Sequence, residues 1–297
     1  MICLNNDWQY TPEWSEDFLS GKGNPVPVRI PHTVSELPLH YADPLKYQMI
    51  SGYRRILPIT PDMKGKRIFV QFDGAAHIAT IYCNGTEIGK HCSGYTAFRF
   101  ELTDYILWDS DNLLSVQLDS TENPAVPPFG YVIDYLTYGG IYRDVWMDVR
   151  PKSYIRDAWV HTPTVHQAVV SLELEEANPE MEIRIRILDS ALKEIATQLV
   201  PYASKSVCIN AEAAIPWDVH SGVLYTAVVE LIHEGKVIDS FDRPFGFRTI
   251  SMDKNNIQIN GKNVFLRGLN RHQCFPYIGY AATESFKEKM HGFSMKN

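Results

Sequence analysis

Strict alternation of apolar and polar residues is the feature that most limits the folds open to this chain. The runs Val169–Glu175 and Glu182–Leu188 place Val, Leu or Ile at every second position, with Ser, Glu or Arg between them. A period of two is that of a β-strand with one buried and one solvated face. Helical periodicity is nearly absent before Thr283. The sequence therefore predicts an all-β protein.

The first half of the chain repeats this pattern in short runs. Lys66–Asp73 and Leu113–Asp119 alternate, and Thr80–Cys83 leads into the hairpin signal Asn84-Gly85. Many short strands separated by Gly, Asn, Asp and Pro turns favour a β-sandwich. We expect residues 1–150 to form a jelly-roll-like β-sandwich.

A second unit begins near Pro151. Besides the two strict runs, Tyr225–Ile232 and Gly235–Phe241 read as strands. About a hundred residues with some seven short strands indicate an immunoglobulin-like β-sandwich over residues 151–250. The chain lacks the Cys…Trp…Cys spacing of antibody domains.

The region 251–297 has a different pattern. Ile257–Phe265 reads as two short strands joined by Asn260-Gly261, a pair that supplies the two positive φ angles of a type I′ turn. We expect an apolar strand next, ending in the polar cluster Arg267–His272, and a helix from Thr283, which suits an N-cap.

Charge and composition exclude several classes of partner. The formal net charge is −7 and no basic run stands out, which argues against nucleic acid and anionic membranes. No apolar run approaches the ~20 residues of a membrane span. Five scattered cysteines predict reduced, mostly buried thiols, and the N-terminus shows no signal peptide, so we expect a cytoplasmic protein. Metal- and cofactor-binding motifs are absent, and no cofactor is expected.

Several segments together resemble one family, glycoside hydrolase family 2, which contains β-galactosidases and β-glucuronidases. Its signatures resemble, in the family's order, Ile81–Phe98, Asp119–Pro128 with Asp134–Val145, Phe245–Thr249 and Val264–His272. The resemblance implies a sugar-binding domain, an immunoglobulin-like domain and the first strand of a (β/α)8 barrel, with a β-galactoside or related β-glycoside as ligand. A homo-oligomeric full-length parent is also expected.

The resemblance further implies a retaining glycosidase. Such enzymes use two carboxyl groups ~5–5.5 Å apart, one as general acid and one as nucleophile. The family's two glutamates lie on later barrel strands and have no counterpart in these 297 residues. Glu173, Glu175 and Glu176 read as a solvated strand face instead. We predict no catalytic residue here and expect the chain to be inactive alone.

Four residues are predicted to bind substrate. The resemblance implies that the loop of Asp134 reaches the barrel mouth, where the carboxylate accepts hydrogen bonds from sugar hydroxyls. It also implies that His272 donates to a hydroxyl, accompanied by Arg271 and Asn270. From the residues alone, Asp134 could instead cap the turn before Tyr135, and the backbone could satisfy His272. Arg271 could equally be a buried structural cation.

Two other functions remain open at this point. A stand-alone carbohydrate-binding module would bind saccharides without turnover. An adhesion or structural sandwich protein would not respond to saccharides, and its Asp134→Ala variant would behave like the parent.

Overall fold

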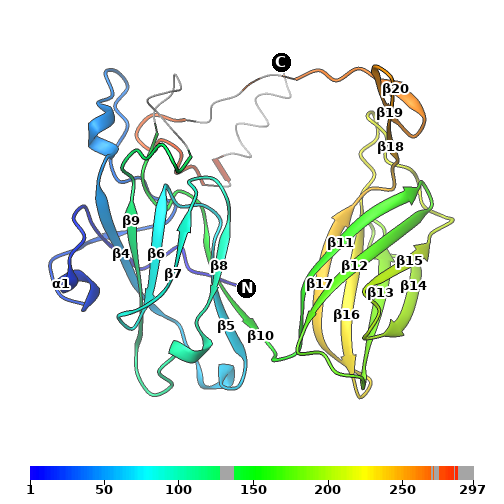
Figure 1. The fold of residues 1–297 in the computed structure, drawn as a ribbon, viewed down its shortest axis with the longest axis horizontal. Coiled ribbons are helices and arrows are strands. Elements are labelled where there is room, and N and C mark those ends of the chain that lie inside the picture. The colour runs from blue at the N-terminus through cyan, green and yellow to red at the C-terminus, as the bar shows by residue number, and fades with distance from the viewer. Residues whose placement is uncertain (128–136, 269, 271–273, 284, 287–297) are drawn as a thin grey trace. The chain divides into compact units, whose positions relative to one another are not determined.

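The computed structural model describes residues 1–127, 137–268, 270, 274–283 and 285–286 of this chain (Figure 1). These residues are nearly all in strands, turns and loops, which confirms the predicted all-β class. The chain divides into two compact units. The first comprises Met1–Val149 with Arg271–Asn297, and the second comprises Arg150–Asn270.

The first unit contains two sheets. One has four strands in the order β1-β10-β5-β8, and the other has six in the order β3-β2-β4-β9-β6-β7. A four-residue helix begins at its N-cap Ser15, whose hydroxyl accepts a hydrogen bond from the Phe18 amide. The elements are β1 (Ile2–Cys3), β2 (Trp8–Thr11), α1 (Glu16–Leu19), β3 (Val26–Val28), η1 (Pro44–Tyr47), β4 (Ile50–Leu57), η2 (Pro61–Met63), β5 (Arg67–Phe72), β6 (Ile78–Cys83), β7 (Thr86–Cys92), β8 (Phe98–Glu101), η3 (Thr103–Tyr105), β9 (Asn112–Asp119) and β10 (Val145–Arg150).

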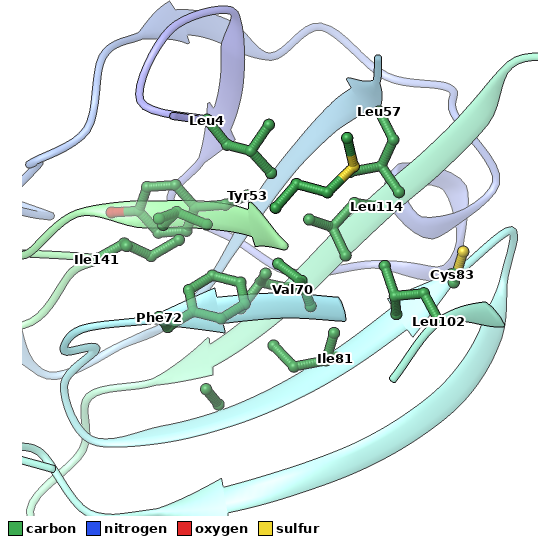
Figure 2. Close-up of a cluster of buried hydrophobic side chains, with 14 of the residues drawn as sticks. Leu4, Tyr53, Leu57, Val70, Phe72, Ile81, Cys83, Leu102, Leu114 and Ile141 are labelled. Atoms are coloured by element: carbon green, nitrogen blue, oxygen red, sulfur yellow. The ribbon is translucent and has the colours of Figure 1, made fainter. Parts of the chain in front are cut away.

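Alternate side chains of these strands form the first core. Figure 2 shows Tyr53 of β4, Ile81 of β6 and Leu114 of β9 pointing toward Val70 and Phe72 of β5. All five side chains are fully buried. Burial of one face of each sheet against the other confirms the predicted sandwich and explains the period of two in the sequence.

The second unit contains a separate sandwich. Its sheets have the strand orders β11-β12-β15 and β14-β13-β16-β17. The core is formed by the apolar residues of the alternating runs, such as Val170, Ile183 and Val229. The strands are β11 (Tyr154–Thr164), β12 (Gln167–Glu175), β13 (Met181–Leu188), β14 (Glu194–Pro201), β15 (Ser206–Asn210), β16 (Tyr225–His233) and β17 (Lys236–Phe245).

A small third sheet follows within the same unit. It consists of β18 (Ile250–Asp253), β19 (Asn256–Ile259) and β20 (Lys262–Val264). Asn260 and Gly261 have φ angles of 50° and 75°, so the predicted turn between β19 and β20 is confirmed. The apolar strand expected next does not continue past Val264, and Phe265 and Leu266 are exposed. No described strand lies beside these residues to complete their backbone hydrogen bonds.

All five cysteines are free, but only Cys83 is buried, so the prediction of mostly buried thiols was wrong. Cys83 and Cys92 lie at opposite ends of the β6–β7 ladder.

Of the helix expected from Thr283, only Ser285 and Phe286 among the described residues are helical. No helix in the described part of the chain is long and apolar enough to cross a membrane.

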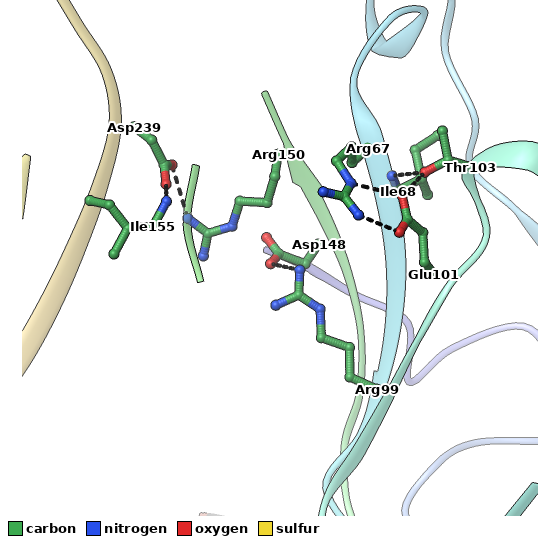
Figure 3. Close-up of polar contacts among 9 residues, drawn as sticks. All are labelled: Arg67, Ile68, Arg99, Glu101, Thr103, Asp148, Arg150, Ile155 and Asp239. Atoms are coloured by element: carbon green, nitrogen blue, oxygen red, sulfur yellow. Dashed lines mark hydrogen bonds and ion pairs between the residues drawn. The ribbon is translucent and has the colours of Figure 1, made fainter. Parts of the chain in front are cut away.

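Arginine–carboxylate pairs connect neighbouring strands in both units (Figure 3). In the first unit, Arg67 donates two hydrogen bonds to Glu101, at 2.9 and 2.7 Å. In the second, Asp239 of β17 accepts a bond of 3.0 Å from Arg150 and one of 2.8 Å from the Ile155 amide. The start of β11 is thereby attached to the opposite sheet.

Glu230 is a nearly buried carboxylate on the outer sheet face of the second unit. It is 7% exposed and accepts hydrogen bonds from Arg184 (2.6 Å) and Arg186 (3.0 Å) of β13. Burial alone would raise the pKa of Glu230, but the two arginines outweigh it and the net shift is downward. Such a group stabilises the fold above its unfolded pKa of about 4.3, and this contribution disappears as the pH falls through the folded value.

We predict that Glu230→Gln lowers the free energy of unfolding of the second unit by about 1–2 kcal/mol at neutral pH, because a charged acceptor is lost. Calorimetric melting between pH 7 and pH 3 measures this, and the variant should lose less stability on acidification than the parent. Glu173→Gln is the matched control, because the Glu173 carboxylate lies 3.8 Å from its partner Arg156 and both side chains are on the surface. Equal pH profiles for parent and Glu230→Gln would contradict the prediction.

Candidate functional site

Three of the four predicted substrate-binding residues, Asp134, Arg271 and His272, lie outside the described residues. Asn270 is described, is exposed and belongs to the second unit. The roles of all four stay predictions. The structure does describe the residues that flank them, and these show how the two segments are held.

Both ends of the segment 128–136, which contains Asp134, are anchored to the first sandwich. Before it, the Pro127 carbonyl accepts a hydrogen bond of 3.0 Å from the Gly94 amide. After it, the buried Thr137 hydroxyl donates to a Glu122 carboxylate oxygen at 3.3 Å. The segment therefore leaves and re-enters a fixed framework.

The residues after His272 also attach to this framework. We call Cys274–Ala282 the docking segment. Tyr277 exchanges two backbone hydrogen bonds with Leu37, at 2.7 and 3.2 Å. Ala281 and Ala282 are buried, and Ala281 belongs to a small apolar cluster with Ala76 and Tyr142 of the first unit. The docking segment is therefore part of the first unit, although the second unit precedes it in sequence.

Tyr138 joins the two segments. Its ring, 5% exposed, packs edge-on against Tyr280 at 4.4 Å and against Tyr47 at 5.4 Å. Burial, followed by a contact with the Cys274 thiol, raises the pKa of the Tyr138 hydroxyl above its ordinary value. Tyr138 follows Asp134 by four residues, and Cys274 follows His272 by two. The structure thus brings together the flanks of both predicted segments.

Glycines permit this close packing. A Cβ atom on Gly279, which has a φ of 54°, would lie 2.7 Å from the Tyr138 ring. A Cβ atom on Gly140, with a φ of 130°, would lie 2.2 Å from the carbonyl oxygen of His32. Both positions require a residue without a side chain.

His77 is a polar group near this region that the sequence analysis did not identify. It is 2% exposed, and neither ring nitrogen has a hydrogen-bond partner. Burial lowers the pKa of His77 to about 4, although the nearby Asp119 opposes the shift. The imidazole is therefore neutral at pH 7. A single histidine just before an apolar strand carried no signal that could have marked it.

Several acidic side chains of the described region pair with arginines. Hydrogen bonds from Arg67 lower the pKa of Glu101, and the pKa of Glu230 is lowered as well. A general acid in a glycosidase needs a raised pKa. Glu173 and Glu175 pair with the surface residue Arg156, in keeping with the predicted solvated face. Among described residues, no group of three or more His, Cys, Asp or Glu could hold a metal ion.

The described residues form two β-sandwich units, and comparison with known families gives the membership of the chain. Residues 19–151 match the profile described as "Glycosyl hydrolases family 2, sugar binding domain". Residues 153–248 match the profile "Glycosyl hydrolases family 2". The chain belongs to glycoside hydrolase family 2, and its first domain matches the sugar-binding domain of that family. The alternative of a sandwich protein unrelated to sugars is therefore wrong.

Individual relatives agree with this assignment. The chain is 32% identical to a β-galactosidase of Thermoanaerobacter pseudethanolicus, over 97% of this chain and 41% of the relative. It is 35% identical to a β-galactosidase of Thermoanaerobacterium thermosulfurigenes, over 97% of this chain and 43% of the relative. A crystal structure of Bacteroides uniformis β-glucuronidase aligns with a TM-score of 0.86 at 25% identity, over 99% of this chain and 38% of that one. The chain thus spans about two fifths of these relatives.

We predict that Gly279→Ala releases the docking segment from Tyr138. Backbone strain and the clash cost about 1–3 kcal/mol, which corresponds to amide exchange about 5- to 150-fold faster at Tyr277 and Gly279. Hydrogen–deuterium exchange with peptide resolution measures this. Gly268→Ala is the matched control, because nothing lies within 4 Å of the Cβ it would add. Unchanged protection in Gly279→Ala would show that the Tyr138 contact does not hold the segment.

Proposed function

We propose that this chain supplies the scaffold and one wall of the substrate pocket of a retaining β-glycosidase that acts on β-galactosides. The observation that carries the proposal is the junction between Tyr138 and the docking segment. It fixes the flanks of Asp134 and His272 on a single unit of a family 2 protein. The galactoside preference is supported by two β-galactosidase relatives at 32% and 35% identity.

In this proposal Asp134 accepts hydrogen bonds from two sugar hydroxyls, and His272 donates to another, with Arg271 and Asn270 beside it. A carboxylate offers two acceptor oxygens, which suits neighbouring hydroxyl groups. In this proposal the bond-breaking acid and nucleophile come from the part of the relatives that this chain does not cover. A cytoplasmic location and a homo-oligomeric parent belong to the same proposal and remain predictions.

A chimera tests the proposal. The aligned N-terminal portion of the T. pseudethanolicus β-galactosidase is replaced by these 297 residues. We predict that the chimera hydrolyses nitrophenyl β-galactoside, whereas the 297-residue chain alone gives no turnover of galactoside or glucuronide. Loss of charged hydrogen bonds should lower kcat/KM of the Asp134→Ala chimera about ten- to a hundredfold.

Glu212→Ala provides the matched control, because Glu212 is an exposed carboxylate of the second unit. It should leave kcat/KM within about twofold of the parent chimera, since an isolated exposed charge contributes little. Thermal melting establishes that each chimera folds. A folded chimera in which Asp134→Ala and Glu212→Ala behave alike would refute the role of Asp134. Turnover by the isolated chain would refute its inactivity, and saccharide binding to a chain whose chimera is inactive would favour a binding module.

A further inference from the structure

A cavity of about 590 Å³ lies entirely within the second unit, at the edge of its three-stranded sheet. It forms because β15 is shorter than its neighbour β12. The two strands pair only as far as Ser171 and Ser206, while β12 continues to Glu175. The loop 202–205 then turns away from β12 after one last hydrogen bond of 2.9 Å, from the Leu172 amide to the Lys205 carbonyl. The volume falls within the range of ~300–1,000 Å³ typical of small-molecule sites.

Trp159 of β11 forms one wall of this cavity. It is 47% exposed, although it lies in the middle of a strand. Its directly opposite neighbour is Ser171, which in turn pairs with Ser206, so the positions straight across the sheet from the indole hold small side chains. Among the residues that the structure describes, none hydrogen-bonds to the Trp159 side chain, stacks on its ring or places a cation over it. The ring face and the indole N–H are both available to a ligand.

The rest of the wall combines apolar residues such as Leu172 and Leu174 with polar side chains of both signs of charge. Three carboxylates and two cations line the cavity, and Arg156 lies 3.2 Å from Glu175 and 3.8 Å from Glu173. The hydroxyls of Tyr202 and Ser204 are also in the lining. This balance disfavours a phosphate or another strongly anionic ligand, since repulsion by three carboxylates opposes it. A neutral polyhydroxyl ligand can donate to the carboxylates and accept from Arg156.

We propose that this cavity binds a neutral saccharide chain, with the apolar face of one sugar ring stacked on Trp159. An aromatic ring beside mixed donors and acceptors matches a sugar, which has one apolar C–H face and a rim of hydroxyls. The choice of a saccharide as ligand rests on the proposed function, which also has a carbohydrate as its ligand. The site itself is independent of Asp134 and His272, because all its lining residues belong to the second unit.

The experiment uses the intact 297-residue chain. Its six tryptophans give six indole N–H signals in a ¹⁵N-resolved NMR spectrum. The signal of Trp159 is assigned by its disappearance in Trp159→Phe. The probes are the neutral tetrasaccharides of β-1,4-linked galactose, glucose, mannose and xylose, with tetragalacturonate as the anionic comparison and sorbitol as the non-cyclic polyol control. We expect at least one neutral tetrasaccharide to shift the Trp159 signal saturably, more strongly than tetragalacturonate or sorbitol.

Variants test the stacking contact. Trp159→Ala should weaken binding of the responding tetrasaccharide at least about tenfold in calorimetric titration, while Trp159→Phe, which keeps an aromatic face, should stay within about threefold of the parent. Trp14→Ala is the matched control, because Trp14 is a half-buried tryptophan of the first unit that stacks on Tyr82. It should bind like the parent. Thermal melting verifies that each variant is folded.

Three outcomes would overturn the proposal. The first is that no neutral tetrasaccharide moves the Trp159 signal. The second is that Trp159→Ala binds as tightly as Trp14→Ala. The third is that Trp159→Ala changes the sedimentation coefficient of the chain, which would identify the cavity as a contact between copies. The NMR titration involves no turnover. An inactive chimera would therefore refute the proposed function without affecting this site. Failure of the titration would refute this site without affecting the proposed function.

Discussion

The packing of Tyr138 is the interaction on which the candidate site depends. Its ring is enclosed by Tyr47 and Tyr280, and Gly279 lies against it where no side chain would fit. Because Tyr280 and Gly279 come after the whole second unit in sequence, this contact closes a loop of more than a hundred residues. Closing so long a loop costs only slightly more entropy than closing a short one. The aromatic junction, the Tyr277–Leu37 backbone pair and the buried Ala281 together hold the docking segment.

Strand positions and sandwich cores could be predicted from the sequence because both depend on local periodicity. The expected run 182–188 became β13, Met181–Leu188, with Ile183, Ile185 and Ile187 in the core. Turn chemistry was equally informative at Asn84-Gly85 and Asn260-Gly261, where all four residues have positive φ. The apolar strand after Val264 was not obtained, because a strand forms only beside a partner. Local pattern specifies which face is apolar but cannot supply the neighbour.

The less predictable features all depend on contacts between distant residues. Glu230 occupies a polar position in an alternating strand and would be assigned to solvent, yet Arg184 and Arg186 enclose it. Cys274 and Tyr138 are 136 positions apart, and nothing near either residue in the sequence indicates that they meet. The family resemblance gave Asp134 and His272 as site residues, whereas residue type alone left each with a structural alternative. The described structure places the flanks of both segments and leaves their chemistry to experiment.

Charged side chains have a structural role in several pairs of described residues. The arginines contact carboxylates that connect strands, as in Arg67–Glu101, Arg150–Asp239 and Arg184–Glu230. Pairing of this kind keeps a carboxylate ionised, which is the opposite of what a general acid requires. Around the docking segment, by contrast, the buried polar groups are neutral, namely the tyrosine hydroxyls and His77. In the described residues, the ion pairs that connect strands and the buried neutral groups beside the docking segment are therefore separate features.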